Sequence, residues 1–193
     1  MGCSRQLLSI IAQISKLDMT VRGSSHRAET QAAVLKDEIS QRLQGLRQTP
    51  PNYANDAHYL TQIAEAKRLA AMLHLEERVP IYSPHSLDEL QVIVLINSIL
   101  LVLSSIPTTS AAVLWPLFIV GSSTMATPRQ RMSILERLKQ LEVSRKLGSI
   151  HHARRLLERK MTASSISWRE HGVVALGSEL HLPTENEKWI SLA

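Results

Sequence analysis

Apolar residues recur at intervals of three and four along most of the chain, the spacing that places them on one face of an α-helix. Ser4 precedes the first run and is suited to cap a helix there. That run consists of Leu7, Leu8, Ile10, Ile11, Ile14 and Leu17. A second run over residues 28–46 predicts another helix with a buried stripe of Val34, Leu35, Ile39, Leu43 and Leu46. Its solvent face is expected to carry Lys36, Asp37, Gln41 and Arg42.

The same spacing predicts helices through the middle of the chain. Residues 56–78 form the third helix, whose inward positions are Tyr59, Leu60, Ile63, Ala66, Leu69, Ala70 and Leu73. Ser86 is placed to cap a fourth, strongly apolar helix that ends before Pro107. A helical seam follows at residues 113–120.

Two more helices are predicted in the last third. Pro128 occupies a first-turn position, and the helix that it starts carries Met132, Leu135, Leu138 and Leu141 or Val143. A final helix over residues 150–161 presents Ile150, Ala153, Leu156 and Leu157. The sequence thus predicts an irregular all-α domain of six to eight helices at residues 1–163. Residues 164–193 are expected to be a weakly ordered segment.

The stretch from Leu90 to Ile106 contains no charged residue and raises the question of a membrane span. A span needs about 20 apolar residues, whereas this stretch is shorter and is interrupted by polar residues such as Asn97. A buried core helix is the better interpretation. A small membrane protein with a span near residues 90–120 remains the alternative.

Composition agrees with one helical domain in a reducing compartment. The 193 residues include only 7 glycines and 8 prolines, and the single cysteine excludes an intramolecular disulfide. The start Met-Gly-Cys-Ser resembles a lipidated terminus, but Gln6 stands where that motif needs Ser or Thr. The net charge of +5 permits an acidic partner without establishing one.

Residues that could carry catalysis do not form a recognisable pattern. The eight histidines are scattered, and the neighbours His151 and His152 point about 100° apart on a helix, a poor geometry for sharing one metal ion. The acidic pairs at 76–77 and 88–89 are expected to be solvated helix faces or helix-start charges. No nucleophile elbow or phosphate-binding glycine loop is present. We therefore expect no enzymatic activity and no cofactor bound by this chain.

Basic residues gather between positions 145 and 160. A candidate basic face consists of Arg154, Arg155, Arg159 and Lys160. Such a group could contact phosphates or act as a nuclear address. Apolar residues interleave at helical spacing, however, so a solvated face of an amphipathic helix explains the charges without any partner.

One segment is unlike the rest, because it groups a tryptophan, a proline and the chain's only phenylalanine. It is Leu114-Trp115-Pro116-Leu117-Phe118-Ile119-Val120-Gly121. This segment resembles the signature of the fungal-specific transcription factor domain, the helical regulatory region that usually follows a six-cysteine zinc cluster. Residues 1–14 and 64–78 are similar to two further segments of that family, in the expected order. In this chain Ser122 replaces the family's cysteine, and Lys67 and His74 stand where an aromatic residue is common.

The resemblance implies a regulatory domain of a nuclear transcription factor. Zinc and DNA contact would belong to a cluster upstream, and the chain resembles the second part of a larger domain. The implied partners are the transcription machinery or a second copy, together with a small effector. Apolar faces on residues 90–106 and 113–120 are expected to lack cover and to promote self-association. A free-standing protein-interaction module is the other alternative.

Overall fold

The computed structural model describes residues 4–21, 26–47, 57–78 and 87–170, and all structural statements below concern these residues. Within them the chain forms seven α-helices, one short 3₁₀ helix and no strand. The α-helices are α1 (Arg5–Val21), α2 (His26–Gly45), α3 (Ala57–Arg78), α4 (Glu89–Ser104), α5 (Leu114–Ser122), α6 (Pro128–Arg145) and α7 (Gly148–Glu170). The all-α prediction of six to eight helices is confirmed. The first three residues of the N-terminal lipidation motif and residues 171–193 of the predicted segment 164–193 lie outside the described residues, whereas residues 164–170 belong to α7.

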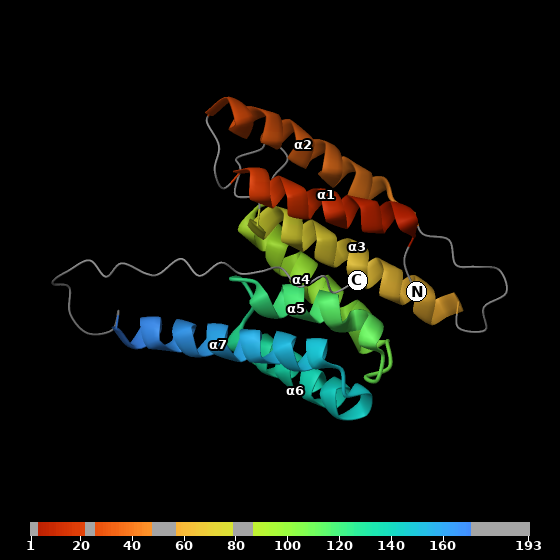
Figure 1. The fold of residues 1–193 in the computed structure, drawn as a ribbon, viewed down its shortest axis with the longest axis vertical. Helices are drawn as coiled ribbons and strands as arrows, with labels where there is room; N and C mark the ends of the chain where they lie inside the picture. Colours follow the sequence, from red (N-terminus) through yellow and green to blue (C-terminus); the bar gives the residue numbers. More distant parts are fainter. Residues whose placement is uncertain (1–3, 22–25, 48–56, 79–86, 171–193) are drawn as a thin grey trace.

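The helices succeed one another along the long axis of the molecule (Figure 1). The pair α1 and α2 lies at one end, α6 and α7 lie at the other, and α3, α4 and α5 fill the space between them. Their buried side chains form two apolar clusters. The smaller cluster joins α1 and α2 to one face of α3, and the larger joins the rest of α3 to α4–α7.

Helix α3 is the element that both clusters share, and its small residues make this possible. Ala66, Ala70 and Ala71 are completely buried, and Ala64 is nearly so. Because alanine projects only a methyl group, neighbouring helices can approach α3 closely from several sides. Tyr59, predicted to point inward, lies near the start of α3 and is exposed instead.

The predicted buried stripe of α2 is partly wrong. Val34 is 65% exposed and Leu35 is also exposed, whereas Lys36, assigned to the solvent face, retains only 2% of its surface. The buried set Ala32, Lys36, Ile39 and Leu43 follows a 4–3–4 spacing, so the helix is rotated from the expected orientation. The hydrophobicity pattern of α2 could not predict this orientation, because the carboxylate that pairs with the buried Lys36 is on another helix.

Helix ends follow the sequence more closely. Ser4 accepts the backbone N–H of Leu7 at 3.2 Å, as predicted. Thr127 and Gln130 form a reciprocal capping box around Pro128, the predicted first residue of α6. The cap of α4 is Asp88, which accepts the N–H of Gln91 at 2.7 Å, so the prediction of Ser86 is wrong. Asp88 lies directly before the first helical residue and carries a charge that suits the helix dipole.

Helix α4 has one buried and one exposed apolar side. Val92, Leu95, Ile96, Ile99 and Leu103 are buried in the larger cluster. Leu90, Val94 and Leu101 point to solvent. Only the outer side of this helix lacks cover, so the expectation for residues 90–106 holds for that side alone. The expectation for residues 113–120 is wrong, because that segment is mostly buried. In the described part of the chain, no helix is both long and apolar enough to span a membrane.

Candidate functional site

The Trp-Pro segment forms α5 in the interior of the molecule. A 3₁₀ turn at Ala111–Val113 leads directly into it, and Pro116 is its third residue. A first-turn residue has no intrahelical acceptor for its N–H, so proline costs little at this position. Of the segment's eight residues, those that are buried are Leu114, Pro116, Leu117, Ile119, Val120 and Gly121.

Trp115 and Phe118 are partly buried and complete the packing of α5. Phe118 packs against the larger cluster, whereas Trp115 contacts both clusters. The Trp115 ring meets the buried His74 ring of α3 edge-on, with centroids 6.3 Å apart and planes at 77°. Such aromatic pairs favour one relative orientation of the two rings. Trp115 therefore links the α1–α2 end of the molecule to the α4–α7 end.

Gly121 allows α5 to approach α6 and α7 closely. A Cβ atom at this position would lie 2.8 Å from Leu157 Cδ1 and 3.2 Å from Ile134 Cγ2. Contacts that short require one of the neighbours to move. The glycine in the segment is thus explained by interhelical distance rather than by a backbone turn.

The turn that follows α5 is anchored by Glu77, near the end of α3. Its Oε1 atom accepts the hydroxyl of buried Ser123 at 2.6 Å, the N–H of Thr124 at 3.1 Å and the Thr124 hydroxyl at 3.3 Å. Arg131 of α6 donates to the carbonyls of Ser123 and Thr124 in the same turn. A carboxylate and a guanidinium thus fix the exit of the Trp-Pro helix.

The neighbouring carboxylate, Glu76, forms a buried ion pair. Lys36 Nζ of α2 lies 2.9 Å from Glu76 Oε2, and the two side chains are only 3% and 6% exposed. The interpretation of Glu76 and Glu77 as solvated charges is therefore wrong, because both carboxylates bind other helices. For Asp88 and Glu89 the helix-start interpretation is confirmed.

Arginines elsewhere bind the carboxyl ends of other elements. Arg68 donates to the carbonyl of Leu43 at the end of α2. Arg137 donates to the carbonyls of Leu103 and Ile106 at the end of α4, and its partial burial lowers the pKa of its guanidinium. Carbonyls at helix ends lack intrahelical partners and carry partial negative charge, so cations are favoured there. Part of the positive charge of the chain therefore has a structural role.

Ion pairs with carboxylates involve one of the four residues of the candidate basic face. Arg154 donates to Glu142 of α6 at 2.7 Å and to Glu158 at 2.5 Å, so its charge is paired within the molecule in a solvent-accessible network. Arg155, Arg159 and Lys160 are exposed on α7. The structure therefore separates one of the four predicted residues from the other three.

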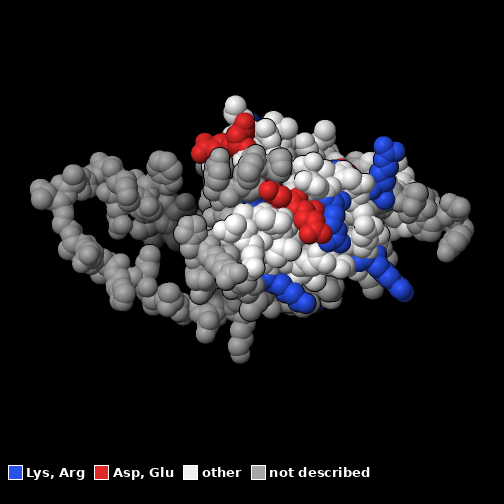
Figure 2. All heavy atoms as spheres, turned by 90° about the horizontal axis from the view of Figure 1, so that it is seen from above, with Lys and Arg blue, Asp and Glu red and all other residues white. Residues whose placement is uncertain are grey.

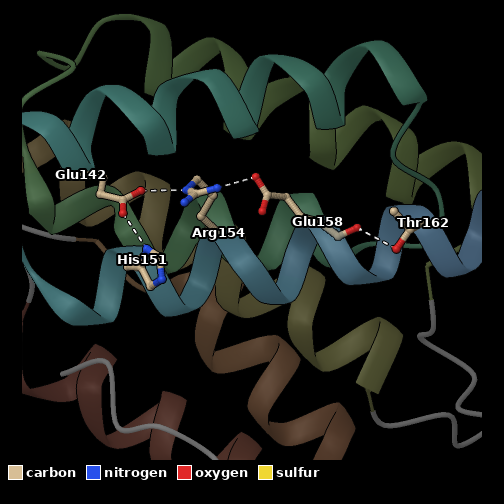
Figure 3. Close-up of polar contacts among 5 residues, drawn as sticks. All are labelled: Glu142, His151, Arg154, Glu158 and Thr162. Atoms are coloured by element: carbon tan, nitrogen blue, oxygen red, sulfur yellow. Dashed lines mark hydrogen bonds and ion pairs between the residues drawn. The ribbon is translucent and has the colours of Figure 1, made fainter.

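The network around Arg154 joins α6 to α7 (Figure 3). Glu142 accepts both Arg154 and His151, whose Nδ1 lies 2.7 Å from Glu142 Oε1. Arg154 first, and His151 second, lower the pKa of the Glu142 carboxyl below its usual range. The two carboxylates in turn raise the pKa of Arg154. Within the described residues no three His, Cys, Asp or Glu side chains are grouped so that they could hold a metal ion.

Charges are sparse among the described residues on the face of the molecule seen from above, along its long axis (Figure 2). Acidic and basic side chains occur in small groups, some side by side, amid uncharged surface. Among the described residues on this face, the charged side chains form no large patch of one sign.

Over residues 1–180 the sequence matches the family model of the fungal specific transcription factor domain. The chain belongs to this family. Comparisons with curated proteins and with solved structures give no significant match. The resemblance inferred from the Trp-Pro segment is thereby confirmed.

In this fungal transcription factor domain, the three segments that carry the resemblance meet at one place. Residues 1–14 supply most of α1, residues 64–78 lie in α3, and residues 114–121 form α5. Both α1 and α5 pack on α3. His74, which stands where the family often has an aromatic residue, provides the ring that contacts Trp115. The segments are therefore parts of a single packing unit.

Sequence reasoning missed the polar residues that hold this unit together. Lys36, Glu76 and Glu77 make contacts between segments far apart in the sequence. The two glutamates lie within the family-like segment 64–78, but no feature of that segment marked them as contacts between helices. The one available signal was the position of Lys36 at helical spacing between Ala32 and Ile39. A charged residue within an otherwise small and apolar stripe indicates a buried partner.

Proposed function

We propose that this chain is a regulatory domain of a transcription factor that transmits a binding event from one end of its helical body to the other. Residues 1–163 would form the working unit, and residues 164–193 an appended segment. The chain would act in the nucleus without catalytic chemistry. DNA would be contacted by a separate zinc-cluster domain.

The observation that carries this proposal is the position of Trp115. It touches both apolar clusters, so a shift of α1 and α2 against α3 would be felt by α5. The exit of α5 is held by Glu77 from α3 and Arg131 from α6. A partner or small effector that displaces one end could therefore alter the other through rigid helices rather than through a loop.

The proposal is tested by tethering the chain to an unrelated DNA-binding domain in a fungal reporter strain. We expect reporter output to change several-fold relative to the DNA-binding domain alone, and the Trp115→Ala variant to lose most of this change at equal protein level. Leu8→Ala, an exposed apolar residue of α1, serves as the matched control. Equal output with and without the wild-type domain would contradict a regulatory role.

A free-standing protein-interaction module is the second candidate, and the exposed apolar side of α4 favours it. Nuclear localisation separates the two. A fluorescent fusion that is excluded from the nucleus while still recovering a stable partner would support the interaction module and oppose the transcriptional role.

A further inference from the structure

The solvent-exposed side of α4 has the spacing of a helix-pairing seam. Leu90, Val94, Asn97, Leu101 and Ser104 follow one another at intervals of 4, 3, 4 and 3 residues, and all five are exposed. The three apolar members retain most of their surface, at 72%, 63% and 73% for Leu90, Val94 and Leu101. This alternation of four and three keeps a row of side chains facing one partner helix.

The seam carries no charge, and both of its polar members already have partners. The Ser104 hydroxyl donates to the carbonyl of Leu101 at 2.7 Å. Asn97 Oδ1 accepts the side-chain amide of Gln130 from α6 at 2.9 Å. A covering helix would therefore desolvate an amide that keeps a hydrogen bond, rather than one left unpaired. Two copies of the seam can meet without like-charge repulsion along its length, although the chain as a whole is positively charged.

Charges at the two ends of the seam are of opposite sign. Asp88 and Glu89 are exposed at the start of α4. At the other end, Arg137 binds the carbonyls of Leu103 and Ile106, and exposed Arg145 binds the carbonyl of Thr109. In an antiparallel pair the acidic end of each helix lies beside the basic end of the other. A parallel pair would place acids against acids.

We propose that α4 is the docking surface for a second copy of this chain, with the two α4 helices antiparallel about a two-fold axis. Leu90 of one copy then faces Leu101 of the other, and Val94 faces Asn97. The same patch serves both copies, as a two-fold interface requires. The occupant is another copy because the seam and its end charges are self-complementary in this one direction.

The size of the seam makes the association weak. At 1.5 Å per residue the 16-residue α4 is about 24 Å long. A single helix face of that length buries a few hundred Å² at most, below the roughly 800 Å² per partner of a standard interface. We expect a dimer with a dissociation constant that is roughly micromolar or weaker.

Sedimentation velocity of the full chain over a concentration series tests the association. The wild-type chain is expected to shift from monomer to dimer across the micromolar range. Val94→Lys should weaken dimerisation at least about tenfold, because it buries an unpaired charge in the middle of the seam, away from the acidic ends. Val143→Lys, at an exposed apolar position of α6, should leave it unchanged, and circular dichroism should show all three to be folded. A wild-type chain that stays monomeric throughout, or equal weakening by both substitutions, overturns the proposal.

Cysteine cross-linking tests the antiparallel direction in a Cys3→Ser background. Leu90→Cys and Leu101→Cys variants, one of them carrying a size tag, are oxidised separately and as a mixture. The antiparallel pair predicts a disulfide-linked heterodimer in the mixture and little cross-linking of either variant alone. Self-cross-linking of Leu90→Cys would show a parallel pair and would overturn the proposed geometry.

The observations that support the docking surface do not depend on the proposed transcriptional role, so the two proposals can fail separately. If the chain dimerises through α4 but leaves the tethered reporter unchanged, the regulatory proposal fails and the interface stands. If the reporter responds and the chain is monomeric, the interface fails and the regulatory role stands.

Discussion

The two sides of α3 are held by different kinds of contact. On the side of α1 and α2, the interface combines a small apolar cluster with the buried pair Lys36–Glu76. On the side of α4–α7, the cluster is larger, and α5 approaches α7 so closely that Gly121 has no room for a side chain. One side of α3 therefore combines a smaller apolar cluster with a buried ion pair, and the other side is held mainly by a larger apolar cluster.

This difference indicates how the two ends respond to change. Apolar contacts are non-directional and tolerate small shifts at modest cost. A buried ion pair is highly sensitive to the loss of one partner, because the remaining charge stays buried with neither water nor a counter-charge to stabilise it. Replacing one member of this ion pair should therefore loosen the packing of α1 and α2 on α3.

The largest effect is expected from Glu76→Ala. This substitution leaves the Lys36 ammonium buried without its partner and should destabilise the fold by about 3–5 kcal/mol. Urea unfolding measures the loss, and hydrogen exchange should show it concentrated in α1 and α2. The exposed Glu38→Ala on α2 is the control and should have little effect.

A paired substitution sharpens the same point. Lys36→Met combined with Glu76→Leu replaces the ion pair with apolar side chains of similar size. It should restore most of the stability, because removing both charges avoids their desolvation. If the double variant is as unstable as Glu76→Ala, the pair acts through shape and not through charge.

Gly121→Leu is expected to come next, at about 1–3 kcal/mol. The added side chain would force Leu157 and Ile134 away from α5. Gly45→Leu is the matched control, because no atom lies within 4 Å of a Cβ there. Thermal unfolding of the two variants should separate clearly. Equal melting temperatures would mean that α5 and α7 can move apart freely.

Glu77→Ala should cost about 1–3 kcal/mol by leaving the donors of buried Ser123 and its neighbour without their acceptor. The effect should spread to both sides of α3, because this carboxylate joins α3 to the exit of α5. If the variant showed faster hydrogen exchange on only one side of α3, Glu77 would not have that bridging role.

The smallest effect concerns pH and the network between α6 and α7. The pKa of Glu142 is lowered in the folded state by Arg154 and His151. Its stabilising contribution is therefore present above the ordinary glutamate range and is lost as pH falls through the lowered value. Wild type should exceed Glu142→Gln in stability at neutral pH, and the gap should close under acidic conditions. Urea midpoints measured from pH 7 down to pH 3 check this; a constant gap would contradict it.

Helix positions and several helix ends were accessible from sequence because they depend on residues close together in the chain. Ser4, Thr127 and Pro128 act within one turn of where they stand. The orientation of α2 was not accessible in this way. Val34 and Leu35 are more apolar than Lys36, yet Lys36 faces the core because Glu76, forty residues away, meets it there.

By itself the sequence determined the helical class, most helix limits and the family, because periodicity, caps and the Trp-Pro segment are local patterns. Only the tertiary structure decided which face of each helix is buried. It also decided which charges are paired within the molecule: Arg154 and Glu76 have ion-pair partners on other helices, whereas Arg155 and Arg159 are exposed on α7. The physical reason is that the cost of burying a polar group depends on the partner it meets, and that partner comes from a distant part of the chain.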